Sequence, residues 1–187
     1  MPGGFGVRGT GGKIACVRYT RENHLPYLGI CLGFQMAVIE YARNVCGLAG
    51  ADSTEMDPDC TDPVIDILPE QKQIEGLGGN MRLGGQDVDL VAGSLASRLF
   101  DGAGRVRMRF RHRYEVDPRY IATLEKGGLV FSGRHPVHPI MQVLELPQDV
   151  HPYFIGTQAH PCLTSRPLRP HPMFKGLVAA ALKSRKG

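Results

Sequence analysis

The sequence predicts an α/β domain in which helices cover a central, mostly parallel sheet. Short apolar runs of strand length alternate along the chain with segments whose apolar residues recur at helical spacing. The 187 residues are 42% hydrophobic and 21% charged, which is typical of one folded globular domain. No repeat or linker divides the chain, so residues 1–187 are expected to form a single domain.

The first half of the chain predicts a turn, a strand, a helix and a long loop region. The opening PGGFG and the following GTGG indicate a glycine-rich turn, because glycine lets the backbone approach a neighbour closely. LPYLGIC is a short apolar run suited to a buried strand, and GFQMAVIEYARNVCG follows with helical spacing. Residues 49–86 are polar and rich in turn residues, so we expect loops there and one short strand at 64–68.

The second half continues the alternation. Helices are expected at 94–100 and 118–126, on either side of the arginine-rich strand RVRMRFRHRYEV. LVFSG, MQVLELP and YFIGTQAHP predict three further strands, and HPMFKGLVAAALKS predicts the last helix.

The arginines of RVRMRFRHRYEV occur at every second position, which places them on one face of a strand. We interpret this face as solvated, with a single arginine used in chemistry. The alternative is a surface for anions or nucleic acid, but no aromatic stacking platform or second basic cluster accompanies it. The five residues are Arg105, Arg107, Arg109, Arg111 and Arg113.

Composition also bears on location and redox state. No apolar run approaches the roughly 18 residues of a membrane span, and the N-terminus lacks the apolar stretch of a secretory signal. The cysteines are odd in number and contain no C-x-x-C pair, which favours a reducing compartment over a disulfide framework. A cytoplasmic location is therefore expected. The five cysteines are Cys16, Cys31, Cys46, Cys60 and Cys162.

The strongest local signal is the G-x-C-x-G pattern centred on Cys31, between an expected strand and an expected helix. This is the pattern of a nucleophile elbow, in which glycines flank a sharp turn and the helix N-terminus stabilises a thiolate. The alternative is a buried structural cysteine in a glycine-bounded turn. His160 in GTQAHP ends a late strand, where a general base could meet Cys31 at the same edge of a parallel sheet.

Two other interpretations of these residues are weaker. A metal site formed by Cys31, His160 and Cys162 would lack an evident fourth ligand, so no metal is expected. The other six histidines have no comparable sequence context, and most of them are expected at the surface.

Several motifs, taken in order, resemble the glutaminase domain of CTP synthase: GGFGVRGTGGK, LGICLGFQMAVIEYARNV, STEMDP, GGNMRLGG, RHRYEV and GTQAHP with SRP. The resemblance covers nearly the whole chain, whereas the elbow alone would indicate only the broad class I amidotransferases. It implies a three-layer αβα, flavodoxin-like class I glutamine amidotransferase fold that lacks its first strands. The domain is accordingly expected to be partial, without the synthetase domain of the family.

The resemblance also implies residue roles. Cys31 would attack the side-chain amide of glutamine to form a thioester, with His160 relaying protons and main-chain N–H groups near Gly4 and Leu32 holding the oxyanion. Glu55 in STEMDP would pair with the α-ammonium of glutamine, and Arg113 in RHRYEV with its α-carboxylate. The glutamine site would also be lined by Leu32, Gly33, Phe34 and Gln35.

Partners and cofactors are implied in the same way. The expected activity is hydrolysis of L-glutamine to glutamate and ammonia, for ATP-dependent amination of UTP to CTP. No cofactor is expected in this chain, because ATP, UTP and Mg²⁺ belong to the synthetase domain. The expected partners are L-glutamine and a synthetase domain or subunit, with homo-oligomers only in its presence. Nucleic acid and membrane are not expected partners.

One departure from the family pattern bears on activity. The family has H-P-E at the base, whereas this chain has His160-Pro161-Cys162, so the acid that orients the histidine is replaced by a thiol. Residue 162 follows the base by two positions and is expected on the same strand face as His160. A catalytically impaired relic or interaction module of the same fold is therefore an alternative to the active glutaminase. Another thiol hydrolase, such as a γ-glutamyl peptidase, would not need STEMDP and RHRYEV.

Overall fold

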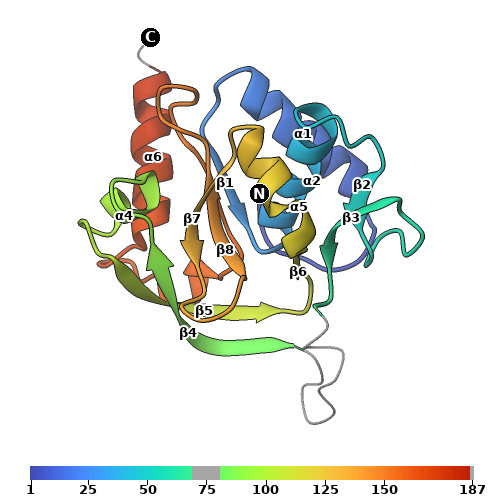
Figure 1. Ribbon diagram of the computed structural model, residues 1–187. Helices are drawn as coiled ribbons and strands as arrows, with labels where there is room; N and C mark the ends of the chain where they lie inside the picture. The colour runs from blue at the N-terminus through green and yellow to red at the C-terminus, as the bar shows by residue number, and fades with distance from the viewer. Residues whose placement is uncertain (69–80, 186–187) are drawn as a thin grey trace.

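The computed structural model describes residues 1–68 and 81–185, and its centre is a six-stranded sheet with the order β1-β9-β8-β7-β4-β5 (Figure 1). A smaller three-stranded sheet, β2-β3-β6, lies at one side. The strands are β1 Tyr27–Ile30, β2 Ala51–Ser53, β3 Asp62–Asp66, β4 Arg82–Leu90, β5 Arg105–His112, β6 Glu115–Val116, β7 Val130–Arg134, β8 Met141–Glu145 and β9 Phe154–Thr157.

Helices cover both faces of the large sheet, as expected for three αβα layers (Figure 1). On one face, α2 packs on β1 and β9 and is itself covered by α1 and α5, while α6 and α4 lie on the other face. No helix in the described residues is long and apolar enough to cross a membrane. The helices are α1 Thr10–Glu22, α2 Leu32–Asn44, α4 Leu95–Leu99, α5 Pro118–Lys126 and α6 Pro172–Ser184, with a 3₁₀ turn η1 Pro161–Leu163.

Each face of the large sheet has its own hydrophobic core. Strand β9 shows the division, because Phe154 packs into the core under α2 whereas Ile155 packs into the core under α4 and α6. Successive residues of a strand point to opposite faces, so one buried strand supplies both cores. Eleven of the 13 residues of α2 are buried, since this helix is enclosed by the sheet, α1 and α5.

Several expected elements are confirmed with their sequence signals. Helix α5 spans Pro118–Lys126, with Pro118 in the first turn and the Asp117 carboxylate accepting a hydrogen bond from the Arg119 N–H. Helix α4 is capped in the same way by Ser94. These ends were predictable because their capping interactions are local in sequence.

The expected sheet direction is wrong. Among the described strands of the large sheet, only β1 and β9 pair in parallel, and the other four pairs are antiparallel. The connections explain this result. Residues 135–140 join β7 to β8 by a hairpin-length turn, whereas a parallel pair requires a crossover of a dozen residues or more. The sheet is therefore mixed.

The expected loop region at 49–86 is also partly wrong. It contains β2, β3 and the start of β4. Outside this region, helix α1 was not expected, and it begins at Thr10, so the last three residues of GTGG are helical rather than part of the expected turn. The expected strand at 64–68 is β3, which begins two residues earlier. Residues 69–80, for which loops were also expected, lie outside the described part of the chain.

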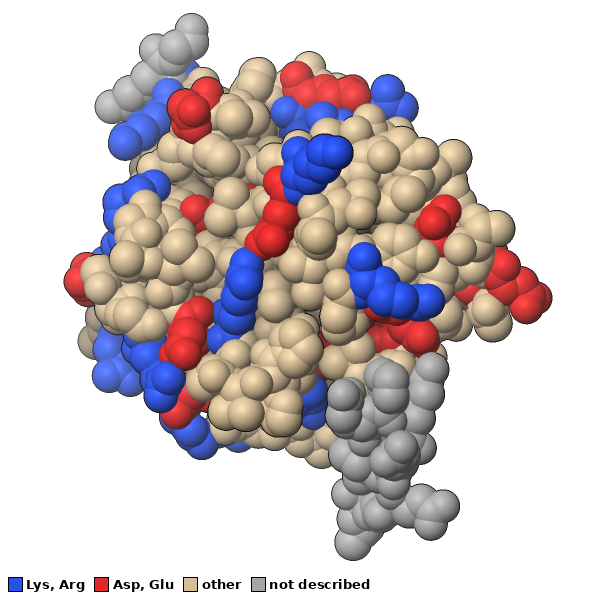
Figure 2. All heavy atoms as spheres, viewed as in Figure 1, with Lys and Arg blue, Asp and Glu red and all other residues tan. Residues whose placement is uncertain are grey.

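The arginine stripe on β5 behaves as a solvated face. All five arginines are exposed, and Met108, Phe110 and His112 between them are buried. Arg105 pairs with Asp89 and Arg107 pairs with Asp87, directly across on β4. In the view of Figure 2, acidic and basic side chains likewise lie next to each other rather than in one basic patch. These pairs favour the solvated interpretation over a nucleic-acid surface.

Helices α1 and α2 are joined by a buried ion pair, which generates a stability prediction. The Glu40 carboxylate is fully buried and accepts hydrogen bonds from Arg21 Nε at 2.9 Å and Arg21 Nη2 at 2.8 Å. Arg21→Met would leave this carboxylate unpaired, so we expect the free energy of unfolding to fall by about 3–5 kcal/mol in urea denaturation. The control is Arg18→Met, which breaks the exposed Arg18–Glu22 pair and should cost under about 1 kcal/mol. Equal losses in the two variants would contradict the prediction.

Candidate active site

Cys31 occupies a sharp turn between β1 and α2. Its backbone dihedrals, φ 51° and ψ −104°, lie in a region that non-glycine residues rarely adopt and that costs on the order of 1–3 kcal/mol. The flanking glycines make the turn feasible: a Cβ on Gly29 would lie 2.7 Å from the Gly33 carbonyl oxygen, and one on Gly33 would lie 2.6 Å from that of Met1. The G-x-C-x-G pattern therefore reflects close backbone packing around a strained cysteine.

The glycine-rich N-terminus brings Cys31 and His160 together. A Cβ on Gly3 would lie 3.3 Å from Cys31 Cβ and 3.2 Å from His160 Cε1, so this segment passes beside both side chains. The Cys31 N–H donates to the Thr157 carbonyl at 2.8 Å, and His160 follows β9 at the start of η1. The predicted nucleophile and base thus lie at the same sheet edge, because β1 and β9 are parallel.

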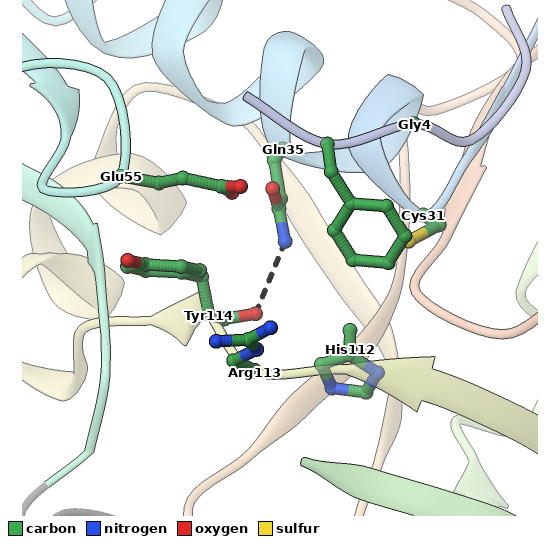
Figure 3. Close-up of a pocket in the computed structure, with 8 residues that line it drawn as sticks. Gly4, Cys31, Gln35, Glu55, His112, Arg113 and Tyr114 are labelled. Carbon is green, nitrogen blue, oxygen red and sulfur yellow. Dashed lines mark hydrogen bonds between the residues drawn. The ribbon is translucent and has the colours of Figure 1, made fainter. Parts of the chain in front are cut away.

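A cavity of about 150 Å³ opens beside Cys31 (Figure 3). Its walls come from the N-terminal segment, α2, the turn after β2 and the end of β5. Five residues predicted to act at the site contribute to it, although they are spread over more than 100 positions of the sequence. The lining residues are Gly4, Phe5, Cys31, Gln35, Glu55, His112, Arg113 and Tyr114.

The cavity carries one carboxylate and one guanidinium from different elements. Glu55 Oε1 accepts a hydrogen bond from the Gly6 N–H at 3.0 Å, which ties the N-terminal segment to the turn after β2. Arg113 reaches the cavity from the end of β5, and its side chain makes no ion pair with any residue in 1–68 and 81–185. Two separated opposite charges suit a ligand that carries both an ammonium and a carboxylate.

A buried ionic cluster supports this wall of the cavity. Glu115 is fully buried, with its Oε1 2.6 Å from Arg82 Nε and 2.8 Å from His112 Nε2. Burial raises the pKa of Glu115, but the charges and hydrogen bonds of His112 and Arg82 outweigh that effect and hold it below its ordinary value. Glu115 is therefore ionised at neutral pH and fixes the segment that carries Arg113 and Tyr114.

Burial sets the protonation states of the predicted pair. Burial raises the pKa of the Cys31 thiol to about 11. The Leu32 N–H and the Gln158 side chain lower this pKa, whereas the negative charges of Glu55 and Glu115 raise it further. Burial also lowers the pKa of His160 below 6.5, so this imidazole is neutral at neutral pH. The buried His160 Nε2 has no hydrogen-bond partner in the described part of the chain. In the free protein the site therefore holds a thiol and a neutral imidazole.

The predicted site residues do not all converge. Leu32, Gly33 and Phe34 are buried in the first turn of α2 and do not line the cavity, although Leu32 Cδ2 would lie 3.2 Å from a Cβ on Gly4. Cys162 is exposed on η1, so the expectation that it shares a strand face with His160 is wrong, because β9 ends at Thr157. No group of three metal-ligating side chains occurs in residues 1–68 and 81–185.

Some residues of the site were missed from the sequence. Phe5, His112 and Tyr114 line the cavity, and Gln158 lies next to Cys31. His112 was given no role from the sequence, but it is 2% exposed and contacts Glu115. Its position within RHRYEV, one residue before a predicted ligand, was the available signal. Gln158 lies in GTQAHP, two residues before the predicted base.

The thiol environment leads to a prediction about reactivity. Cys31 is 2% exposed and has a pKa of about 11, whereas Cys16 and Cys162 are exposed. We expect iodoacetamide at neutral pH to modify Cys16 and Cys162 at least about 100-fold faster than Cys31, because only thiolates react. The measurement is mass spectrometry of the five cysteine peptides over time. Preferential labelling of Cys31 would show that its thiolate already exists in the free protein.

Comparisons with known proteins agree with this arrangement. The family model of class I glutamine amidotransferases matches residues 1–180. The CTP synthase of Natronomonas pharaonis is 56% identical over 184 residues, covering 98% of this chain and 33% of that protein. The CTP synthase of Thermococcus kodakarensis is 53% identical, covering 100% of this chain and 35% of that protein. The chain thus spans about a third of the length of these curated relatives.

Solved structures show the same relationship. The Trypanosoma brucei CTPS glutaminase domain with bound acivicin superposes with a TM-score of 0.89 at 37% identity, covering 97% of this chain and 69% of that chain. A GMP synthase-like protein from Thermoplasma acidophilum, with a TM-score of 0.57 and 14% identity, covers 93% of this chain and 66% of that chain and shows a likeness of fold alone. This chain therefore belongs to the class I glutamine amidotransferase family, and within that family it is similar to the glutaminase domain of CTP synthase.

Proposed function

We propose that this chain is the glutamine-hydrolysing part of a CTP synthase. L-glutamine binds in the cavity beside Cys31, and its side-chain amide is hydrolysed to glutamate and ammonia. The observation that carries the proposal is the convergence of Cys31, Glu55 and Arg113 on one cavity from three separate parts of the sequence. Glu55 would hold the α-ammonium group and Arg113 the α-carboxylate, which leaves the amide directed toward Cys31.

The reaction would proceed through a thioester. Cys31 Sγ attacks the amide carbon while its proton passes to His160, and the main-chain N–H groups of Gly4 and Leu32 hold the oxyanion. The C–N bond then breaks, and the departing nitrogen takes the proton from His160 and leaves as ammonia. His160 next removes a proton from water, which attacks the thioester, releases glutamate and restores the thiol.

In the whole protein, the ammonia would be used by a synthetase portion for the ATP-dependent amination of UTP to CTP. The similarity to whole CTP synthases supports this step, although it lies outside the portion that aligns with this chain. ATP, UTP and Mg²⁺ would bind that synthetase portion, and the glutaminase chemistry requires no cofactor of its own. Homo-oligomers would likewise form through the synthetase portion.

A second candidate is a catalytically impaired domain of the same fold, and the charge state of the site favours it. Burial raises the pKa of the Cys31 thiol to about 11 and lowers the pKa of His160, so proton transfer from this thiol to this imidazole is uphill. A carboxylate beside His160 would reduce this difference, but the chain has Cys162 in the family position. Activity therefore depends on whether bound glutamine compensates.

A glutaminase assay separates the two candidates. We expect the chain to release ammonia from L-glutamine and Cys31→Ala to release none, because the thioester cannot form. Cys162→Glu should raise kcat about tenfold or more with little change in glutamine affinity, since a carboxylate stabilises the imidazolium in the transition state. Cys162→Ser, which adds no charge, is the matched control and should not gain activity.

The outcomes of this assay are distinct. Ammonia release by Cys31→Ala at the parent rate would exclude Cys31 as the nucleophile. An inactive parent that becomes active as Cys162→Glu would establish the impaired domain. A fully active parent that Cys162→Glu does not improve would show that the missing carboxylate is not limiting.

Glutamine binding tests the roles of the two charges in the cavity. In a Cys31→Ala background, Glu55→Gln and Arg113→Met should each weaken glutamine binding by roughly 1.5–3 kcal/mol, as for hydrogen bonds to charged groups. Isothermal titration calorimetry gives the affinities. Arg111→Met is the matched control, because Arg111 precedes Arg113 by two residues but does not line the cavity. Binding that is unchanged in both site variants, or weakened equally in the control, would contradict the assignment.

A further inference from the structure

A buried glutamine lies directly beside the nucleophile. In the parallel pair of β1 and β9, Ile30 is in register with Thr157, which is the last pair of the two strands, and Cys31 and Gln158 are the residues that follow them. The Cys31 N–H donates to the Thr157 carbonyl at 2.8 Å, which fixes the two backbones at this position. The Gln158 side chain bonds Gln35 in the first turn of α2, and Cys31 is the residue from which α2 starts, so both side chains lie on the α2 side of the sheet. Gln158 therefore flanks Cys31 at the point where the chain turns into α2.

The amide of Gln158 is only half satisfied. Its side chain is fully buried, and its Oε1 accepts a hydrogen bond from Gln35 Nε2 at 3.2 Å. Gln35 Nε2 also donates to the Tyr114 carbonyl at 3.1 Å (Figure 3). These contacts determine which end of the Gln158 amide carries the NH₂ group, and that nitrogen has no hydrogen-bond partner in residues 1–68 and 81–185. A buried donor without a partner is costly, so a buried native donor of this kind calls for a functional explanation.

We propose that the side-chain amide of Gln158 is the hydrogen-bond donor that stabilises the Cys31 thiolate during catalysis. The inference rests on the proposed role of Cys31 as the nucleophile. In the free protein the thiol is protonated and needs no strong donor, which explains why Gln158 Nε2 is unpartnered there. Once the proton leaves for His160, the negative sulfur becomes a strong acceptor beside this nitrogen. Gln35, which bonds this amide, and Tyr114, whose carbonyl accepts from Gln35, both line the cavity, so the donor is linked to residues of the ligand site.

The charges around Cys31 make such a donor necessary. The Glu55 carboxylate from the turn after β2 and Glu115 from β6 both disfavour a negative sulfur, and His160 carries no positive charge until it accepts the thiol proton. Within the described part of the chain, the groups that favour the thiolate are the Leu32 N–H and the Gln158 amide. Cys162 replaces the acid that orients His160 in the family. Stabilisation of the Cys31 thiolate therefore depends more on hydrogen bonds to the sulfur than it would in a complete triad.

The experiment measures the rate at which iodoacetamide alkylates Cys31 in the full chain, at several pH values below the thiol pKa. Gln158→Met, which keeps the size but removes the donor, should slow alkylation about tenfold, which corresponds to one pKa unit. Gln158→Glu, which keeps the shape and adds a negative charge, should slow it further. The control is Gln142→Met, because Gln142 on β8 is equally buried, its side-chain amide has no hydrogen-bond partner in the described residues, and it is not among the groups that mainly set the thiol pKa. It should leave the rate within about twofold.

Each result decides the proposal. Equal slowing by Gln158→Met and Gln142→Met would assign the effect to packing and overturn it, as would an unchanged rate in Gln158→Met. Circular dichroism shows whether Gln158→Met folds. If it does not, the isosteric Gln158→Glu takes its place, and an unchanged alkylation rate of Cys31 in Gln158→Glu also overturns the proposal. Because alkylation needs no turnover, a failure of the proposed glutaminase activity appears in the ammonia assay alone. Where the parent is active, Gln158→Met should lower kcat about tenfold with KM nearly unchanged.

Discussion

The backbone turn at Cys31 is the constraint on which the rest of the site depends. A cysteine with positive φ is held there because Gly29 and Gly33 allow backbone contacts that no Cβ could tolerate, and because β9 and Met1 hydrogen-bond to the strand on either side. The Tyr27 hydroxyl adds a hydrogen bond to the Gly33 carbonyl at 2.8 Å. Packing, rather than intrinsic preference, maintains this strained conformation, and it places the sulfur at the start of α2.

The same burial that holds the turn also makes the thiol a weak acid. Removing Cys31 from water raises its pKa and lowers that of His160, so the two groups do not form an ion pair in the free protein. Activation then depends on donors that can meet a negative sulfur and on a base that can accept its proton. The chain retains a fixed, buried amide for the first role and lacks the carboxylate that would assist the second. The stability of the turn and the reactivity of its cysteine therefore oppose each other.

The predictions from the sequence differ in accuracy for a physical reason. Helix α5 was placed correctly because its proline and its capping aspartate act on their own first turn. The sheet direction was wrong because pairing is a long-range property that depends on connection lengths and on which strands share a core. The position of Cys162 was wrong because the chain leaves β9 at Thr157, and the sequence gives no clear sign of this early end.

The sequence by itself determined the family, the glycine-flanked turn at Cys31 and the identity of the charged residues at the cavity, because each of these is encoded in a short contiguous motif. Only the tertiary structure decided that Gly4, Glu55 and Arg113 meet at one cavity, that His112 is buried against Glu115, and that Gln158 flanks Cys31. These relations join residues that are distant along the chain. They arise from the register of β1 with β9 and from the packing of β5 and β6, which no local pattern specifies.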